Sequence, residues 1–161
     1  MEKNELKVEE TFLQKALDGK VQVRLSLTNR ERLACVVSNL SRYDINIDSD
    51  GSVMTLPKKE VSYISCQQPL LEEGFFKEAP AADPAASRSK VQDEYLARFV
   101  REKTLTLLRL VNGDELRGVL DGFDGFTIAL RTSRGQVLLY KHGLCSISPG
   151  YRRRKENENV R

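Results

Sequence analysis

The chain has 161 residues, of which 40% are hydrophobic and 30% charged, and its formal net charge at pH 7 is +3. This composition is that of an ordinary soluble globular protein, and no stretch approaches the roughly 20 apolar residues that a membrane-spanning helix requires. The N-terminus has no apolar segment to act as a signal peptide, and Cys35, Cys66 and Cys145 lack metal or disulfide spacing. We therefore expect a cytoplasmic protein without membrane association.

The sequence repeats itself at an offset of 83 residues, without a gap. The hydrophobic pattern keeps its phase throughout the repeat, which chance rarely preserves. The matched pairs include Leu25 with Leu108, Leu27 with Leu110, Asn29 with Asn112, Leu33 with Leu116, Ile45 with Ile128, and Ile64 with Ile147. A repeat of this kind indicates two copies of one small domain.

Each copy is predicted to begin with a short amphipathic helix, followed by strands. The apolar residues at helical spacing are Phe12, Leu13, Ala16 and Leu17 in the first copy, and Tyr95, Leu96, Phe99 and Val100 in the second. In the first copy, alternation over residues 21–27 predicts a strand.

The second copy carries the clearer strand signals. Leu105 and Leu107 alternate in a first strand, and Asn112-Gly113 is a strong hairpin-turn signal. Gly118 is suited to a sharp bend in the second strand. Three more strands are predicted over residues 126–130, 136–140 and 144–148.

One helix and five short antiparallel strands per copy predict a mainly β fold with two domains, each built on a strongly bent, barrel-like sheet. We place the domains at residues 9–66 and 92–150. Residues 67–91, rich in Pro and Ala, predict a flexible linker. The basic residues 151–161 predict a disordered tail.

The second copy resembles Hfq, the bacterial branch of the Sm/Lsm family, over residues 91–149. The motifs that carry the resemblance are Gln92-Asp93, Tyr95-Leu96, Leu110-Val111-Asn112-Gly113, Leu116-x-Gly118, Phe123-Asp124-x-Phe126 and Tyr140-Lys141-His142. The first copy, which has diverged, resembles the family only through the internal repeat. The whole chain therefore looks like a tandem Hfq-related protein with two Sm-like domains.

The resemblance implies a ring of six Sm-like units, in which the fourth strand of one unit pairs with the fifth strand of the next. Two units per chain favour a trimer that forms a pseudo-hexamer. A flexible linker of this length spans roughly 25–30 Å, which is close to the diameter of a small domain. A hexamer of chains, with two stacked rings, is the alternative.

The resemblance also implies a site for uridine-rich single-stranded RNA on the helix-bearing face. Phe126 would stack on a base, Gln92 would bond a uracil edge, Lys141 would contact uracil or phosphate, and His142 would contact phosphate or ribose. The alternatives are that Phe126 is a core residue, His142 structural and Lys141 a solvated charge. Tyr140 is expected at the subunit interface.

A weaker, basic rim is expected at Arg98, Arg101 and Lys103. These residues can equally be solvated helix charges. Asp114 and Glu115 add carboxylates to the opposite face, where Arg109 replaces an aromatic residue of the family pattern. This composition argues against adenine-rich RNA on that face.

Several positions depart from the family pattern. Gly125 replaces a polar amide of the second copy. The first copy has Pro57-Lys58-Lys59 in place of Tyr-Lys-His and Glu9-Glu10 in place of Gln-Asp, while Tyr43 aligns with Phe126. We expect the first copy to be mainly architectural, with weaker RNA contacts through Tyr43, Lys58 and Lys59.

No nucleophile–base set, paired-His spacing or phosphate loop is present in the sequence. We therefore expect no enzyme activity, no metal and no cofactor. The leading hypothesis is an RNA-binding ring that acts as an RNA chaperone or post-transcriptional regulator. The alternative is a ring scaffold for protein interactions with little selective RNA binding.

Overall fold

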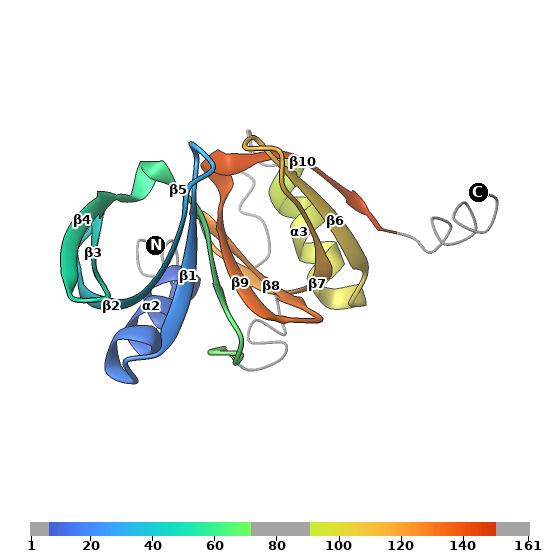
Figure 1. Cartoon of the computed structure of the whole chain (residues 1–161). Helices are drawn as coiled ribbons and strands as arrows, with labels where there is room; N and C mark the ends of the chain where they lie inside the picture. Colours follow the sequence, from blue (N-terminus) through green and yellow to red (C-terminus); the bar gives the residue numbers. More distant parts are fainter. Residues whose placement is uncertain (1–6, 72–90, 151–161) are drawn as a thin grey trace.

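The computed structural model describes residues 7–71 and 91–150, which form two units of one helix and five strands each (Figure 1). The first unit comprises α2 (Lys7–Asp18), β1 (Gln22–Leu27), β2 (Arg32–Leu40), β3 (Asp44–Ser49), β4 (Ser52–Pro57), the 3-10 turn η1 (Lys58–Glu60) and β5 (Val61–Cys66). The second comprises α3 (Val91–Glu102), β6 (Leu105–Leu110), β7 (Glu115–Phe123), β8 (Thr127–Thr132), β9 (Gly135–Tyr140), η2 (Lys141–Gly143) and β10 (Leu144–Pro149). The predicted mainly β fold is confirmed.

The ungapped repeat is visible in the strands, since each strand of the second unit begins 83 residues after its counterpart in the first. Left-handed backbone recurs at equivalent positions as well. Lys20 has φ 49° and Lys103 φ 52°, while Arg30 has φ 78° and Gly113 φ 98°. The predicted turn at Asn112-Gly113 joins β6 to β7.

Each helix packs its apolar stripe on the sheet of its own unit, α2 against β2 and α3 against β7. The stripe residues Phe12, Leu13, Leu96 and Phe99 are buried. Within the second sheet, a Cβ on Gly118 would lie 2.2 Å from the carbonyl oxygen of Arg131. Only glycine permits this approach of β7 to β8, which gives the predicted glycine of the bend its physical reason.

The two units form one continuous sheet of ten strands, in the order β10-β6-β7-β8-β9-β5-β1-β2-β3-β4. The units meet where β5 pairs antiparallel with β9, at the centre of the molecule in Figure 1. Tyr63 lies opposite Leu139 and Cys66 opposite Gln136. The fifth strand of one unit thus pairs with the fourth strand of the other, within a single chain.

The junction between the units is part of the hydrophobic core. Ala129, Leu138 and Tyr140 of the second unit belong to the buried cluster of the first, and Tyr63 of the first belongs to the cluster of the second. Close backbone contact accompanies this packing, because a Cβ on Gly135 would lie 2.0 Å from the carbonyl oxygen of Cys66. Each unit therefore has its own buried cluster, and each cluster includes residues of the other unit across the β5–β9 pair.

Residues 67–71, predicted as the start of the linker, pack on the second unit. The amides of Leu70 and Leu71 each donate to Oε1 of Gln136 at 2.9 Å. Arg131 donates to the carbonyl of Leu71 at 3.0 Å, and Asp121 accepts from both Arg131 and Gln136. The remainder of the predicted linker up to residue 90, and the predicted tail at 151–161, lie outside the described residues.

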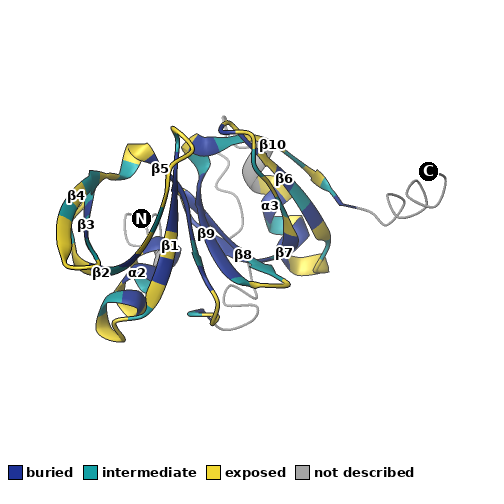
Figure 2. Cartoon of the chain, viewed as in Figure 1, coloured by how far each residue is buried: buried dark blue, intermediate teal, exposed yellow. Residues whose placement is uncertain are grey.

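The sheet ends at β4 and β10, which leaves one edge strand on each unit. These edges differ in burial from their counterparts: β9 and β5 are mostly buried, whereas β4 and β10 are mostly exposed or half-buried (Figure 2). Neither described helix has the length and apolar run needed to cross a bilayer.

Candidate functional site

An exposed aromatic ring lies beside a lysine at the start of β8. Phe126 is 52% exposed, so it is not the core residue that the alternative interpretation required. The Lys141 amide donates to the carbonyl of Phe126 at 2.8 Å, which holds the two residues side by side. The Lys141 Nζ lies over the ring of buried Phe123, 5.4 Å from its centroid. The site therefore offers a flat apolar ring and an ammonium group together.

Asp124 fixes the backbone that presents Phe126. Its Oδ1 accepts hydrogen bonds from the amide of Phe126 at 2.9 Å and from the amide and hydroxyl of Thr127 at 2.8 Å each. Burial raises the pKa of the Asp124 carboxyl, and these hydrogen bonds oppose the rise. The aromatic ring is thus presented by a preorganised turn.

The first unit repeats this geometry with different side chains. The Lys58 amide donates to the carbonyl of Tyr43 at 2.8 Å, the same bond and length as in the second unit. Tyr43 is 71% exposed, and the guanidinium of Arg42 lies 5.7 Å from its ring centroid. Ser41 stands in place of Asp124 and bonds Asp44 through its hydroxyl. Both units therefore present an aromatic ring beside a lysine.

Glu9 connects the two units at this face. The Tyr140 hydroxyl donates to Oε2 of Glu9 at 2.6 Å, and Lys58 Nζ lies 3.0 Å from the same oxygen. The Glu9 amide donates to Oδ2 of Asp124 at 2.8 Å. Since Glu9 is only 2% exposed, these partners compensate the cost of burying its charge.

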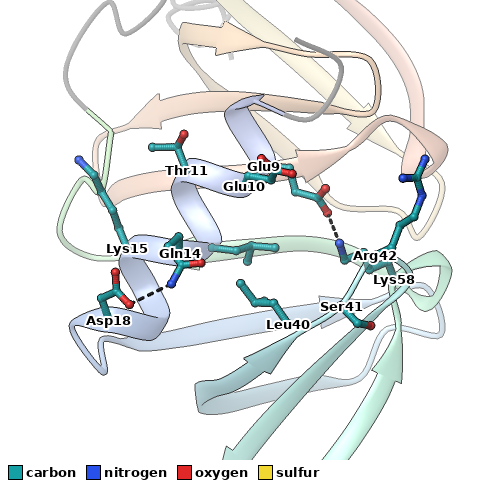
Figure 3. Close-up of a pocket in the computed structure, with 11 residues that line it drawn as sticks. Glu9, Glu10, Thr11, Gln14, Lys15, Asp18, Leu40, Ser41, Arg42 and Lys58 are labelled. Atoms are coloured by element: carbon teal, nitrogen blue, oxygen red, sulfur yellow. Dashed lines mark hydrogen bonds and ion pairs between the residues drawn. The ribbon is translucent and has the colours of Figure 1, made fainter. Parts of the chain in front are cut away.

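Figure 3 shows the Glu9 carboxylate directed toward Lys58, at the rim of a groove of about 720 Å³ between α2 and the segment from Leu40 to Arg42. Burial and the neighbouring Glu9 carboxylate raise the pKa of Tyr140 well above 10, so the hydroxyl remains a donor. Sequence reasoning missed the role of Glu9. The sequence did contain a signal for it: at the 83-residue offset the carboxylate Glu9 takes the place of the neutral Gln92, while the first copy keeps a lysine, Lys58, that such a carboxylate can pair with.

His142 spans the junction as well. Its Nε2 lies 2.8 Å from the carbonyl oxygen of Val61, and its ring stacks on Tyr140 at 5.4 Å. Because a carbonyl oxygen only accepts, Nε2 carries the proton and donates. In the neutral ring, Nδ1 is then an acceptor. Tyr140, expected at a subunit interface, lies at the junction inside the chain.

The structure places the other predicted residues on or near the helices. Gln92 is in the first turn of α3, but its side chain is outside the described part of the structure. Arg98, Arg101 and Lys103 are exposed, and the Arg98 guanidinium lies 5.9 Å from the ring centroid of Tyr95. Lys59 is exposed on η1.

The carboxylates predicted to repel RNA are paired. Arg32 of the first unit bonds both carboxylate oxygens of Asp114, and the Tyr63 hydroxyl donates to Asp114 at 2.9 Å. Glu115 lies 3.2 Å from Arg109. The Asp114 charge therefore ties the units together. In the described residues, no group of three or more His, Cys, Asp and Glu side chains is arranged to hold a metal.

Two bent five-stranded units, joined by fourth-to-fifth strand pairing and each with an aromatic–lysine pair, define a tandem Sm-like protein. The family model described as "Hfq protein" matches residues 91–156. The RNA-binding protein Hfq of Bacillus cytotoxicus is 42% identical over 59 residues, which are 37% of this chain and 80% of that relative. The Hfq of Bacillus thuringiensis matches to the same extent. The chain belongs to the Hfq family.

A solved structure of Hfq, there called a pleiotropic translational regulator, also matches. It aligns at 27% sequence identity with a TM-score of 0.36 over 37% of this chain and 98% of that one. The relatives are named for RNA binding and not for a reaction, in agreement with the prediction that this chain is not an enzyme.

Proposed function

We propose that this chain binds uridine-rich single-stranded RNA in the cytoplasm, as a ring that acts as an RNA chaperone or post-transcriptional regulator. The observation that carries the proposal is Phe126, a half-exposed ring held beside Lys141 in a chain whose relatives are RNA-binding proteins. Stacking a base on an aromatic ring is a common way to bind single-stranded RNA.

The proposed contacts extend from this pair. A uracil stacks on Phe126, the Lys141 ammonium donates to a uracil oxygen or a phosphate, and Gln92 bonds the uracil edge. His142 already donates to Val61 through Nε2. Its Nδ1 therefore suits a donor such as the ribose 2′-hydroxyl better than a phosphate, which only accepts. Arg98, Arg101 and Lys103 add non-specific phosphate contacts at the rim.

The proposed ring is a trimer of two-domain chains. The free edges β4 and β10 are the counterparts of β9 and β5, the strands that already pair inside the chain. Unpaired edge strands present a row of backbone donors and acceptors that pairs readily with another chain. Pairing β10 of one chain with β4 of the next repeats the internal junction and closes a pseudo-sixfold ring.

The sites around this ring are unequal. Three are built on Phe126, Lys141 and His142. Three weaker ones are built on Tyr43, Lys58 and Lys59, because Lys58 is held by the Glu9 carboxylate. The Glu9–Lys58 pair has no net charge, so it attracts an RNA phosphate less than a lysine alone. The two kinds of site alternate.

Fluorescence anisotropy with labelled oligo-uridine and oligo-adenine tests the RNA site. We expect selective oligo-uridine binding, weakened about tenfold or more by Lys141→Ala with His142→Ala, since a stacked and hydrogen-bonded base contributes about 1–3 kcal/mol. Arg24→Ala with Arg134→Ala is the matched control, because it removes two exposed cations that lie outside the site. Equal binding of both oligomers, unchanged by the first variant, refutes the site.

Native mass spectrometry tests the ring. Three chains of 18.3 kDa give about 55 kDa, whereas six give twice that mass. A monomer at micromolar concentration contradicts the ring proposal, and six chains favour stacked rings.

The alternative of a protein-interaction ring has one structural support, the neutralisation of Lys58 by Glu9. The acidic turn at Asp114 supports this alternative less, because the Asp114 carboxylate is paired with Arg32 and so repels phosphate less. Purification with and without ribonuclease separates the two functions. Protein partners that survive digestion, without co-purifying RNA, favour the scaffold.

A further inference from the structure

The segment that follows β5 binds to the second unit through a defined polar cluster. Leu71 is buried, and its amide and carbonyl are bonded by Gln136 and Arg131. Asp121 orients both of these side chains, at 2.8 Å from Gln136 Nε2 and 3.0 Å from Arg131 Nε. The chain that leaves the fifth strand of one unit is thus held on the sheet of the unit that pairs with it.

The repeat also shows which residues of the first unit correspond to the cluster that binds residues 67–71 on the second unit. At the 83-residue offset, Ser38, Asp48 and Val53 are the counterparts of Asp121, Arg131 and Gln136. Ser38 and Asp48 line a groove of about 940 Å³. Asp50, which also lines it, is exposed at the β3–β4 turn. In the internal junction Leu70 and Leu71 occupy this position, whereas on the first unit the described residues leave a groove there.

The segment that follows β10 differs in charge from the segment that follows β5. Gln67-Gln68-Pro69-Leu70-Leu71 corresponds to Gly150-Tyr151-Arg152-Arg153-Arg154, and Lys155 comes next. The charge of the binding position changes in the opposite direction, which suits a basic segment. Where the second unit has the cation Arg131, the first unit has the carboxylate Asp48.

Two cations also line the groove, Lys20 and Arg32. Arg32 is paired with Asp114 at 2.9 Å, so its charge is compensated. Opposite charges across an interface favour the correct partner and register.

The segment after β10 cannot reach the groove on the first unit of its own chain. The end of β10 and the first unit lie on opposite sides of the molecule in Figure 1, and β10 and β2 are seven strand positions apart in the sheet. Five extended residues reach at most about 18 Å, whereas seven strand spacings cover about 34 Å along the sheet.

We propose that residues 151–155 of one chain dock in the groove at Asp48 and Asp50 of the next chain in the ring. This inference rests on the ring proposed above. The basic tail then reinforces the junction between chains as residues 67–71 reinforce the junction within the chain.

Zero-length carbodiimide crosslinking of the full-length protein tests the contact. It joins an amine to a carboxylate only when the two are in direct contact, so we expect a crosslink between Lys155 and Asp48 or Asp50. In a ring assembled from isotope-labelled and unlabelled chains, the crosslinked peptides should contain one labelled and one unlabelled partner. Crosslinks found only within one chain, or no crosslink to these carboxylates in an intact trimer, overturn the proposal.

Two variants measure the contribution of the contact to the ring. Asp48→Asn with Asp50→Asn removes both charges, yet keeps the hydrogen bond that Asp48 accepts from the Gly51 amide and tolerates the positive φ of Asp50. The dissociation constant of the trimer should rise about three- to tenfold, as for two partly exposed ion pairs. Asp18→Asn with Glu31→Gln is the control for net charge and should leave it unchanged.

Replacing Arg152, Arg153 and Arg154 by Ser should have the effect of the groove variant. If the trimer is unaffected by both variants but the tail variant weakens oligo-uridine binding, the tail is an RNA contact and the proposal is wrong. If no trimer forms in the wild type, the ring itself fails, and native mass separates this result from the loss of the tail contact alone.

Discussion

The hydroxyl of Tyr140 donates a 2.6 Å hydrogen bond to the carboxylate of Glu9, across 131 residues of sequence. Glu9 lies at the start of α2 and Tyr140 at the end of β9. This bond joins the aromatic–lysine sites of the two units, because Glu9 also pairs with Lys58 and Tyr140 stacks on His142.

Tyr140→Phe should destabilise the junction. The substitution keeps the ring but removes the donor to a buried carboxylate, which costs about 1.5–3 kcal/mol. Urea unfolding followed by circular dichroism measures the change. Tyr95→Phe is the matched control, since the Tyr95 side chain is 48% exposed and its loss of a hydroxyl should change stability little. Equal effects of the two variants would show that the bond adds nothing to stability.

The contribution of Tyr140 to stability should fall as the pH rises above about 10. The pKa of Tyr140 is raised in the folded state by burial and by Glu9, so the unfolded chain loses this proton first. Stability from the bond is therefore complete below the unfolded pKa of 10.0 and is lost between that value and the folded pKa.

Each group of this kind contributes a slope of at most about 1.4 kcal/mol per pH unit. Urea midpoints between pH 8 and 11 measure it. Tyr63 has a raised pKa as well, so Tyr140→Phe should remove part of the slope and Tyr63→Phe another part. An unchanged slope in Tyr140→Phe contradicts the assignment.

Gly135→Ala should disrupt the contact between the units. Gly135 has φ +142°, and an added Cβ would lie 2.0 Å from the carbonyl oxygen of Cys66. The expected loss is about 3 kcal/mol or more. Gly51→Ala is the control, since Gly51 also has a positive φ but nothing lies within 4 Å of its Cβ. It should cost about 1–2 kcal/mol, from backbone strain alone.

Phe126→Ala should weaken oligo-uridine binding by about 5- to 150-fold, the equivalent of 1–3 kcal/mol per stacked base. Stability should change little, because the ring is half exposed. Tyr43→Ala in the first unit should reduce oligo-uridine affinity less, since its site is the weaker one. Anisotropy titrations of both variants compare them. A larger loss for Tyr43→Ala reverses the proposed order of the sites.

Glu9→Gln should strengthen the weaker sites. The amide oxygen still accepts from Tyr140, but the ion pair with Lys58 at 3.0 Å is lost, and Lys58 becomes available for phosphate. We expect oligo-uridine binding to tighten about two- to fivefold, which is the range of one new ion pair between Lys58 and a phosphate at the surface. The double variant Glu9→Gln with Lys58→Ala should cancel the gain. Binding that stays unchanged in Glu9→Gln means that the carboxylate does not limit these sites.

Local patterns were enough to predict the domains' architecture from the sequence. The helical stripe at Phe12 and the turn at Asn112-Gly113 each depend on neighbouring residues, and the 83-residue repeat extends the same pattern to both copies; all three are present. Phe126 was ambiguous, because a strand alternation does not tell which face meets solvent. Its exposure depends on the turn that Asp124 holds in place.

The contacts that join the two units were beyond sequence reasoning. The bond from Tyr140 to Glu9 and the pair of Arg32 with Asp114 link residues far apart in the chain, and each side chain alone resembles a surface charge or an interface tyrosine. Residues 67–71 have linker composition, yet the carbonyl and amide of Leu71 satisfy a buried cluster in the other unit. Only the paired strands β5 and β9 bring these groups together.

The β5–β9 pair also sets how the proposed ring responds to dilution. That junction forms within one chain, so its equilibrium does not depend on protein concentration, whereas the β10–β4 junction requires a second molecule and weakens as the protein is diluted. Pro57 and Pro149 lie on those two edge strands and lack the amide hydrogen that a full ladder uses. A disassembling ring therefore opens at every second junction and releases intact two-domain blocks, each of which keeps one complete inter-unit junction.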